Sequence, residues 1–116
     1  MLSFYHFPYL KVTLAIRRNS SEYLQIGVSI CSLHDNFSRK EGRRIATLRA
    51  YSNMRVYTSS YVQAIVDTLS VLDNNTVKLT KQTHKTVREL VLALLGITDL
   101  TPIKVSKTIP IDEIPF

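Results

Sequence analysis

The stretches LKVTLAIR (residues 10–17) and YLQIGVSI (residues 23–30) decide the fold of this chain. In each of them apolar residues occupy every second position. Successive side chains of a β-strand point to opposite faces, so a period of two is typical of a strand that buries one face. The turn-forming residues Asn19, Ser20 and Ser21 separate the two runs. The pattern therefore predicts an antiparallel hairpin.

The two faces of this hairpin differ in character. One face carries the apolar residues Leu10, Val12, Leu14, Ile16, Leu24, Ile26, Val28 and Ile30. The other carries Lys11, Thr13, Arg17, Tyr23, Gln25, Gly27 and Ser29. We expect the apolar face to pack on the core and the polar face of the first strand to remain half-exposed.

Two segments after the hairpin carry signals for helix starts. Ser38 and Glu41 are spaced as a capping box, and Asp35 is a rival N-cap. A second capping box, Ser60 with Gln63, predicts a helix that runs to residue 72 and is closed by residues 73–75. Residues 54–58 between these helices are a possible short strand.

The last part of the chain divides into a helix and an extended arm. A third helix is predicted from about residue 81 to 95, with Gly96 as its C-terminal stop. From residue 98 onward prolines exclude helix. The arm (residues 98–116) is expected to cover a surface of its own domain or, in the preferred interpretation, of a neighbouring copy. The predicted fold is α+β, with residues 1–97 as a single domain whose two or three helices pack on one face of the sheet. A homo-oligomer is expected.

Composition limits the classes of partner. The chain has 116 residues, 45% of them apolar, and 15 Lys and Arg against nine Asp and Glu, which leaves a formal charge of +6. Such a charge favours an anionic partner. Cys31 is the only cysteine, so an internal disulfide is excluded and a reducing compartment is expected. No signal peptide and no apolar run long enough for a membrane span is evident.

The start of the first predicted helix is crowded with positive charge. Arg39, Lys40, Arg43 and Arg44 stand there against the single acid Glu41. Cations at this end oppose the helix dipole, while the first helical amides point outward and bind anions readily. We therefore expect a ligand that bears phosphate or carboxylate groups here, and a phosphorylated ligand is preferred. The candidate ligand residues are Ser38, Arg39, Lys40, Arg43 and Arg44, with Phe37, Tyr51 or Tyr57 available to a nucleotide base.

A secondary basic site opens the third helix, at Lys81, His84, Lys85 and Arg88. Its charge is sparser, and a solvated face is the favoured interpretation. The N-terminal aromatic residues Phe4, Tyr5, Phe7 and Tyr9 offer a platform for stacked bases. An edge strand or an oligomer contact is the favoured alternative for them.

The sequence contains no recognisable pattern of catalytic or metal-binding residues. His34 and Asp35 could form an acid–base pair, but no nucleophile with an orienting partner accompanies them. The histidines are too scattered for a metal site, and the chain has only three glycines, which rules out a glycine-rich phosphate loop. We expect a protein that is not an enzyme and needs no cofactor or metal.

The run DNFSRKEGRRIA (residues 35–46) resembles a pattern of small bacteriophage accessory proteins, Asp-x-Phe-Ser-Arg/Lys-x-x-Gly-Arg-x-Ile-Ala. The resemblance implies a small soluble phage protein that acts in the cytoplasm of the bacterial host. Such proteins include anti-defence factors that sequester nucleotide signals, such as the anti-Thoeris and anti-CBASS sponges, and inhibitors of host proteins. Leu48 stands where the pattern often has a small residue, so Arg49 is left out of the ligand set.

Three hypotheses for function follow from these features. The first is a protein that sequesters a phosphorylated, nucleotide-like ligand and counters bacterial immune signalling. The second keeps the basic helix and makes a DNA or RNA strand the partner. The third is an inhibitor that docks on an acidic host protein and binds no small ligand.

Overall fold

The computed structural model describes residues 2–18, 23–53 and 55–96. Its secondary structure consists of strands β1 (Leu2–Phe7), β2 (Val12–Arg18), β3 (Tyr23–Ile30) and β4 (Tyr57–Thr58), and helices α1 (Arg39–Ser52), α2 (Ser59–Asn74) and α3 (Lys81–Leu95). The strands form one antiparallel sheet in the order β1-β2-β3-β4. The α+β class predicted from the sequence is confirmed.

The predicted hairpin is the centre of the sheet. Strands β2 and β3 pair with Leu14 opposite Val28 and Ile16 opposite Ile26. The aromatic N-terminal segment forms β1, which pairs with β2 and occupies one edge of the sheet. The edge-strand interpretation of that segment is therefore confirmed. Strand β4 is the short strand expected between the first two helices.

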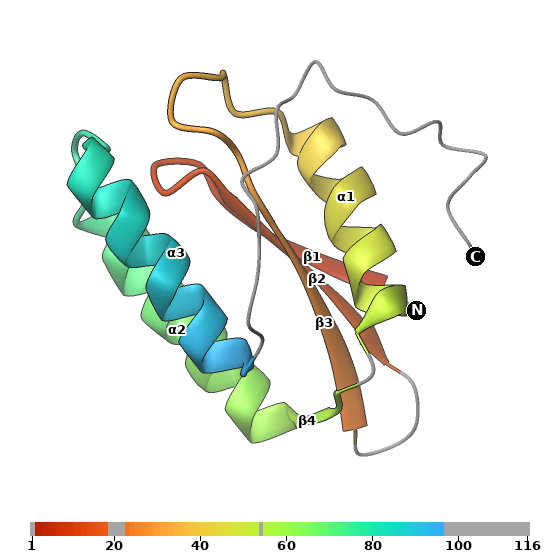
Figure 1. Ribbon diagram of the computed structural model, residues 1–116. Coiled ribbons are helices and arrows are strands. Elements are labelled where there is room, and N and C mark those ends of the chain that lie inside the picture. The colour runs from red at the N-terminus through yellow and green to blue at the C-terminus, as the bar shows by residue number, and fades with distance from the viewer. Residues whose placement is uncertain (1, 19–22, 54, 97–116) are drawn as a thin grey trace.

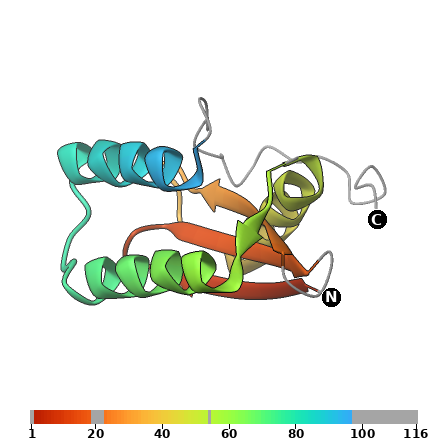
Figure 2. The same ribbon diagram turned by 90° about the horizontal axis from the view of Figure 1, so that it is seen from below.

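Helices cover both faces of the sheet, so the prediction that they pack on one face is wrong. Helix α1 lies on one side of the sheet, and α2 and α3 lie side by side on the other (Figures 1 and 2). The apolar face of β2 and β3 packs against α2 and α3 and forms the main core. The opposite face, with Thr13, Ala15, Gly27 and Ser29, is also buried and receives α1.

The close approach of α1 to the sheet depends on two glycines. A Cβ atom on Gly27 of β3 would lie 1.9 Å from the Ala46 carbonyl oxygen and 2.2 Å from the Ala50 amide nitrogen. A Cβ atom on Gly42 of α1 would lie 2.4 Å from Oγ1 of Thr13, a side chain that is 0% exposed. Backbone and small side chains therefore fill this interface. The missing side chain of Gly42 makes room for the sheet rather than for a ligand.

The ends of α2 and α3 show which predicted boundaries were right. Helix α3 spans the predicted residues and ends at Gly96, which adopts the left-handed conformation with φ 68°. Helix α2 is capped by Thr58 rather than Ser60, because the Thr58 hydroxyl accepts the hydrogen bond from the Tyr61 amide. It also continues past the predicted end to Asn74.

Asp73 anchors α2 to the far end of the sheet. The sequence placed it in a closing turn, but it lies inside α2 and is buried. Its Oδ1 atom accepts hydrogen bonds from the backbone amides of Tyr9 (2.9 Å) and Leu10 (3.0 Å). These amides belong to the turn between β1 and β2, where Lys11 has a positive φ of 60°. One buried carboxylate therefore fixes the turn that sets the register of the edge strand.

Two further observations complete the fold. The predicted C-terminal arm, residues 98–116, lies outside the described residues, and the oligomer that it predicts stays a prediction. Within the described part of the chain, no helix combines the length and apolar character that crossing a membrane requires.

Replacing Gly27 by alanine is expected to cost more than about 3 kcal/mol of unfolding free energy, because the new Cβ meets helix backbone that cannot rotate away. G42A is the matched control. Its loss of unfolding free energy should be smaller, because the new Cβ would meet the hydroxyl of the Thr13 side chain and not helix backbone. Chemical denaturation of both variants measures the difference. A G27A protein within about 0.5 kcal/mol of the parent would show that α1 is not seated as described.

The Asp73→Ala substitution should lower the unfolding free energy by about 2 kcal/mol or more, since it leaves two backbone amides without an acceptor. Asp67→Ala, at an exposed position of the same helix, is the control and should change stability little. Thermal melts compare the two. Equal losses of thermal stability in the two variants would mean that the hydrogen bonds from the turn to Asp73 do not stabilise the fold.

Candidate anion-binding site

The first two turns of α1 present three exposed cations, Arg39, Lys40 and Arg43, which we call the cationic start. Among the described residues, no carboxylate lies within salt-bridge distance of any of the three. Exposed, unneutralised cations at a helix start oppose the helix dipole and repel one another. The arrangement is costly unless an anion binds there.

Arg44, the fourth cation predicted for this site, is buried and does not join the cationic start. Its side chain is 7% exposed and forms an ion pair with Glu41, with 2.8 Å between Nη2 and Oε2 and 2.9 Å between Nε and Oε2. A spacing of three residues on a helix brings the two side chains together. Glu41, the single acid of the first turn, is thereby engaged with Arg44, and the cationic start keeps its charge.

Backbone amides of α1 add to the site. Ser38 is the N-cap in preference to Asp35, and its hydroxyl accepts a hydrogen bond from the Glu41 amide at 3.2 Å. The first backbone bond of the helix runs from the Gly42 amide to the Ser38 carbonyl at 2.9 Å. The amides of Arg39 and Lys40 precede that bond and point out of the helix start. Anions bind such amides readily.

The side chain of Lys11 stabilises the loop that leads into α1. The Lys11 ammonium group donates hydrogen bonds to the backbone carbonyls of Leu33 (2.8 Å) and Asp35. The thiol of Cys31 donates to the carbonyl of Asn36 at 3.5 Å. Burial raises the pKa of this thiol, a positive Lys11 nearby lowers it, and Asp35 raises it. These contacts fix the path of the chain up to Ser38.

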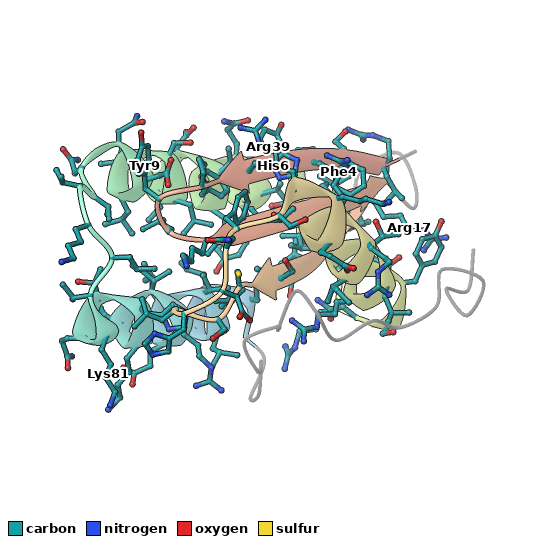
Figure 3. The ribbon with its side chains drawn as sticks, turned by 90° about the horizontal axis from the view of Figure 1, so that it is seen from above. Phe4, His6, Tyr9, Arg17, Arg39 and Lys81 are labelled. Atoms are coloured by element: carbon teal, nitrogen blue, oxygen red, sulfur yellow. The ribbon has the colours of Figure 1, made fainter. Side chains whose placement is uncertain are left out.

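His6 is a member of the site that the sequence analysis missed. It lies on the same face of β1 as Phe4, toward α1, and Figure 3 labels it close to Arg39. Its Nδ1 atom is 3.3 Å from Oγ1 of Thr13, and its ring meets Phe37 edge to face, with centroids 6.3 Å apart. Burial lowers the pKa of His6, and the positive charges of Arg39 and Arg43 lower it further. The field of the cationic start therefore reaches this imidazole.

The two tyrosines proposed for a nucleotide base do not join the cationic start. At a rise of 1.5 Å per residue, Tyr51 lies about 18 Å along α1 from Arg39. The Tyr51 ring packs instead against the Arg17 guanidinium, whose Cζ atom lies 4.4 Å from the ring centroid. Tyr57 is buried on β4 and donates its hydroxyl hydrogen to the Leu95 carbonyl at 2.6 Å. Of the predicted aromatic residues, only Phe37 lies beside the cations.

The secondary basic site lies at the start of α3. Lys81 and Lys85 are exposed, Arg88 is half-buried, and the four predicted residues together with Gln82 line a shallow hollow. The Nε2 atom of His84 is 2.9 Å from the Cys31 carbonyl, which ties this helix to the end of β3. The starts of α1 and α3 thus face the same end of the molecule (Figure 1), while Figure 3 shows Lys81 well apart from Arg39.

Comparison with known proteins adds no assignment, because no family model, curated protein or solved structure matches this chain. Within residues 2–18, 23–53 and 55–96, no three His, Cys, Asp or Glu side chains gather as metal ligands would.

Substituting Arg39 or Arg43 by glutamine should raise the pKa of His6, because each arginine disfavours the protonated imidazole. Lys40→Gln is the matched control and should leave the His6 pKa nearly unchanged. An NMR titration of the His6 ring in the three variants checks this. A His6 pKa that responds to Lys40 as strongly as to the arginines would contradict the described arrangement.

The lowered pKa of His6 also predicts how stability depends on pH. The unfolded chain takes up a proton near the ordinary histidine pKa of 6.5, and the folded chain takes it up only at lower pH. The contribution of His6 to stability is therefore fully present above pH 6.5 and is lost as the pH falls below it. Denaturation of the parent and of His6→Gln at a series of pH values tests this sign.

Proposed function

We propose that this protein is a non-enzymatic binding module that captures a phosphate-bearing, nucleotide-like ligand at the cationic start of α1. The observation that carries the proposal is the set of three exposed cations at a capped helix start, without an acidic partner among the described residues. Their mutual repulsion is relieved when an anion binds.

A phosphate group suits this arrangement better than a single negative charge does. The planar guanidinium groups of Arg39 and Arg43 donate paired hydrogen bonds that match phosphate oxygens, and Lys40 adds a third positive charge. The outward amides of the first turn supply further donors. A ligand with two phosphates would use both arginines at once.

The rings beside the cationic start favour a nucleotide over inorganic phosphate. Phe37 and His6 are half-buried and meet edge to face, and the positive charge of Arg39 acts on His6. Aromatic faces stack on nucleotide bases and are worth about 1–3 kcal/mol per base. The pair would hold a base while the arginines hold its phosphates.

The proposed biological role comes from the resemblance of residues 35–46 to phage accessory proteins. It supports a protein that sequesters a nucleotide signal in the bacterial host cytoplasm and so counters immune signalling. The residues of that run that the structure leaves exposed are Asn36, Arg39, Lys40 and Arg43, and the proposed binding uses the three cations among them.

A single-stranded nucleic acid is the second candidate ligand. The observation in its favour is that the basic starts of α1 and α3 face the same end of the molecule. A strand that contacts both starts would use Arg39 and Arg43 together with Lys81 and Lys85. Its affinity would fall steeply with added salt, since each neutralised phosphate releases counterions.

The test compares two double variants that remove the same charge, R39Q/R43Q and K81Q/K85Q. Calorimetric titrations of the full chain use pyrophosphate, a nucleoside diphosphate and a cyclic dinucleotide. R39Q/R43Q should weaken nucleotide binding about tenfold or more, while K81Q/K85Q should change it less than about twofold. Both arginine contacts are lost in the first variant, whereas the second variant changes only the distant helix.

The same titrations distinguish the two alternative partners, a nucleic acid strand and an acidic protein surface. If both double variants weaken binding equally and longer oligonucleotides bind better, the ligand is a nucleic acid strand. If no phosphate compound binds, the nucleotide proposal fails, and the cationic start then fits an acidic protein surface, which a pull-down from bacterial lysate would find.

A further inference from the structure

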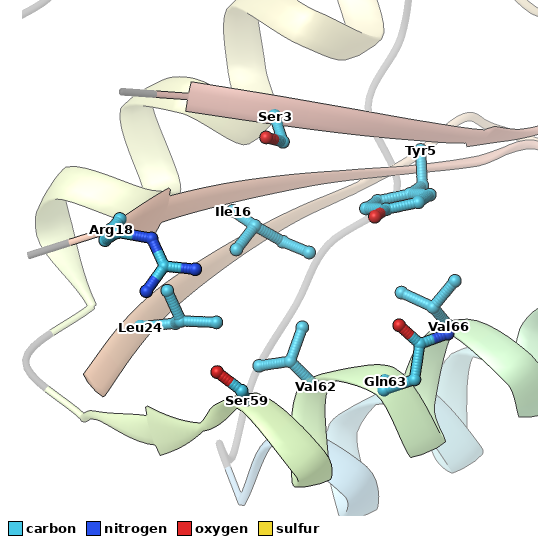
Figure 4. A pocket seen from close by; sticks show the side chains of 9 residues that line it. All are labelled: Ser3, Tyr5, Ile16, Arg18, Leu24, Ser59, Val62, Gln63 and Val66. Carbon is cyan, nitrogen blue, oxygen red and sulfur yellow. The ribbon is translucent and has the colours of Figure 1, made fainter. Parts of the chain in front are cut away.

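A pocket of about 200 Å³ lies on the other side of the sheet, between the edge strand β1 and the first half of α2 (Figure 4). The residues that line it are Ser3, Tyr5, Ile16, Arg18, Leu24, Ser59, Val62, Gln63 and Val66. It shares no residue with the cationic start. On β1 the two sites alternate, because Phe4 and His6 face α1 while Ser3 and Tyr5 face α2.

The pocket has an apolar floor. Ile16 of β2, Leu24 of β3, and Val62 and Val66 of α2 are all buried members of the main core. Their side chains nevertheless line the pocket, so the gap between β1 and α2 reaches down to the core. Apolar surface of this kind favours an apolar group over water.

The two ends of the pocket carry different polar groups. Figure 4 shows the guanidinium group of Arg18 and the hydroxyl of Ser59 at one end, and the phenol of Tyr5 and the amide of Gln63 at the other. Gln63 donates a hydrogen bond to Asp67 at 2.8 Å, which orients its amide. The charged group of the pocket is therefore confined to one end.

That end is positive for two independent reasons. Arg18 is the last residue of β2, and its side chain reaches over Leu24 toward the pocket. Ser59 is the first residue of α2, a helix of 16 residues with no acid in its first turn. The positive end of the α2 dipole and the Arg18 guanidinium thus face the same volume.

The volume limits the ligand to a compact molecule. An apolar protein cavity of about 150 Å³ holds a benzene ring, so about 200 Å³ admits one ring with a short substituent or a branched chain of similar size. A nucleotide is too large for it. The apolar floor takes the ring, and the positive end takes a charged substituent.

We propose that this pocket binds small carboxylic acids with a single ring or a short branched chain, with the carboxylate on Arg18 and the apolar body on Ile16, Val62 and Val66. An arginine takes a carboxylate through two parallel hydrogen bonds. The Ser59 hydroxyl and the start of α2 add attraction for the same group. The site is independent of the proposed nucleotide site.

The test is an NMR titration of the full chain with phenylacetate and with 2-phenylethanol, its uncharged counterpart. Phenylacetate should shift the amides of Ser3, Tyr5 and residues 59–63 in a saturable manner, and 2-phenylethanol should bind the same residues about fivefold or more weakly. Shifts that are confined to residues 38–43, or an absence of saturable shifts, would overturn the proposal.

Two variants separate the carboxylate from the apolar contact. Arg18→Gln should reduce the affinity for phenylacetate about fivefold and leave the affinity for 2-phenylethanol unchanged, whereas Arg55→Gln, an exposed control, should change neither. Val62→Phe fills the pocket and should abolish binding of both compounds. Equal affinities for the two compounds in the parent protein would overturn the role of Arg18.

Binding that survives Val62→Phe in a protein whose amide spectrum remains dispersed would overturn the location of the site. If Val62→Phe does not fold, Tyr5→Trp, at an exposed position on the pocket wall, supplies the second obstruction. Phenylacetate affinity should then fall while the spectrum of α1 stays as in the parent.

Discussion

The contact between α1 and the sheet at Gly27 is the constraint on which the rest of the structure depends. No side chain separates the helix from β3 there, because even one Cβ atom would overlap helix backbone. This contact sets the height and position of α1 above Thr13 and Ser29, whose side chains meet Gly42. It thereby determines which α1 side chains are covered by the sheet, as Ala46 is, and which remain on the surface, as the cationic start does.

The electrostatics of the cationic start are a consequence of that placement. Arg44 turns to the single first-turn acid and is buried, so Arg39, Lys40 and Arg43 remain without an acidic partner in the part of the chain that the structure describes. The same position of α1 on the sheet brings the start of the helix close to β1, where the positive charges of Arg39 and Arg43 act on His6. Burial lowers the pKa of this imidazole most, and the further lowering by Arg39 and Arg43 indicates a positive potential that is available to an anion.

The sequence predicts the elements of this fold better than their arrangement. The period of two in β2 and β3 and the glycine stop at Gly96 are local signals, and the structure confirms both. No comparable pattern in the sequence predicts that the second face of the sheet is buried. Its residues Thr13, Ala15, Gly27 and Ser29 are together not apolar enough to indicate a packed surface. The roles of His6 and Tyr51 depend on strand register and helix length, which bring Phe37 next to His6 and place Tyr51 beside Arg17.

The two faces of the sheet offer different chemistry, with exposed cations and rings beside α1 and a half-open pocket beside α2. The central claim concerns the first of these, and the pKa of His6 measured with and without a saturating nucleoside diphosphate tests it most directly. Phosphates on Arg39 and Arg43 would neutralise the arginine charges that add to the effect of burial on this pKa, so we expect the His6 pKa to rise when the ligand binds. An unchanged His6 pKa in the presence of bound nucleotide would place the ligand elsewhere and contradict the account.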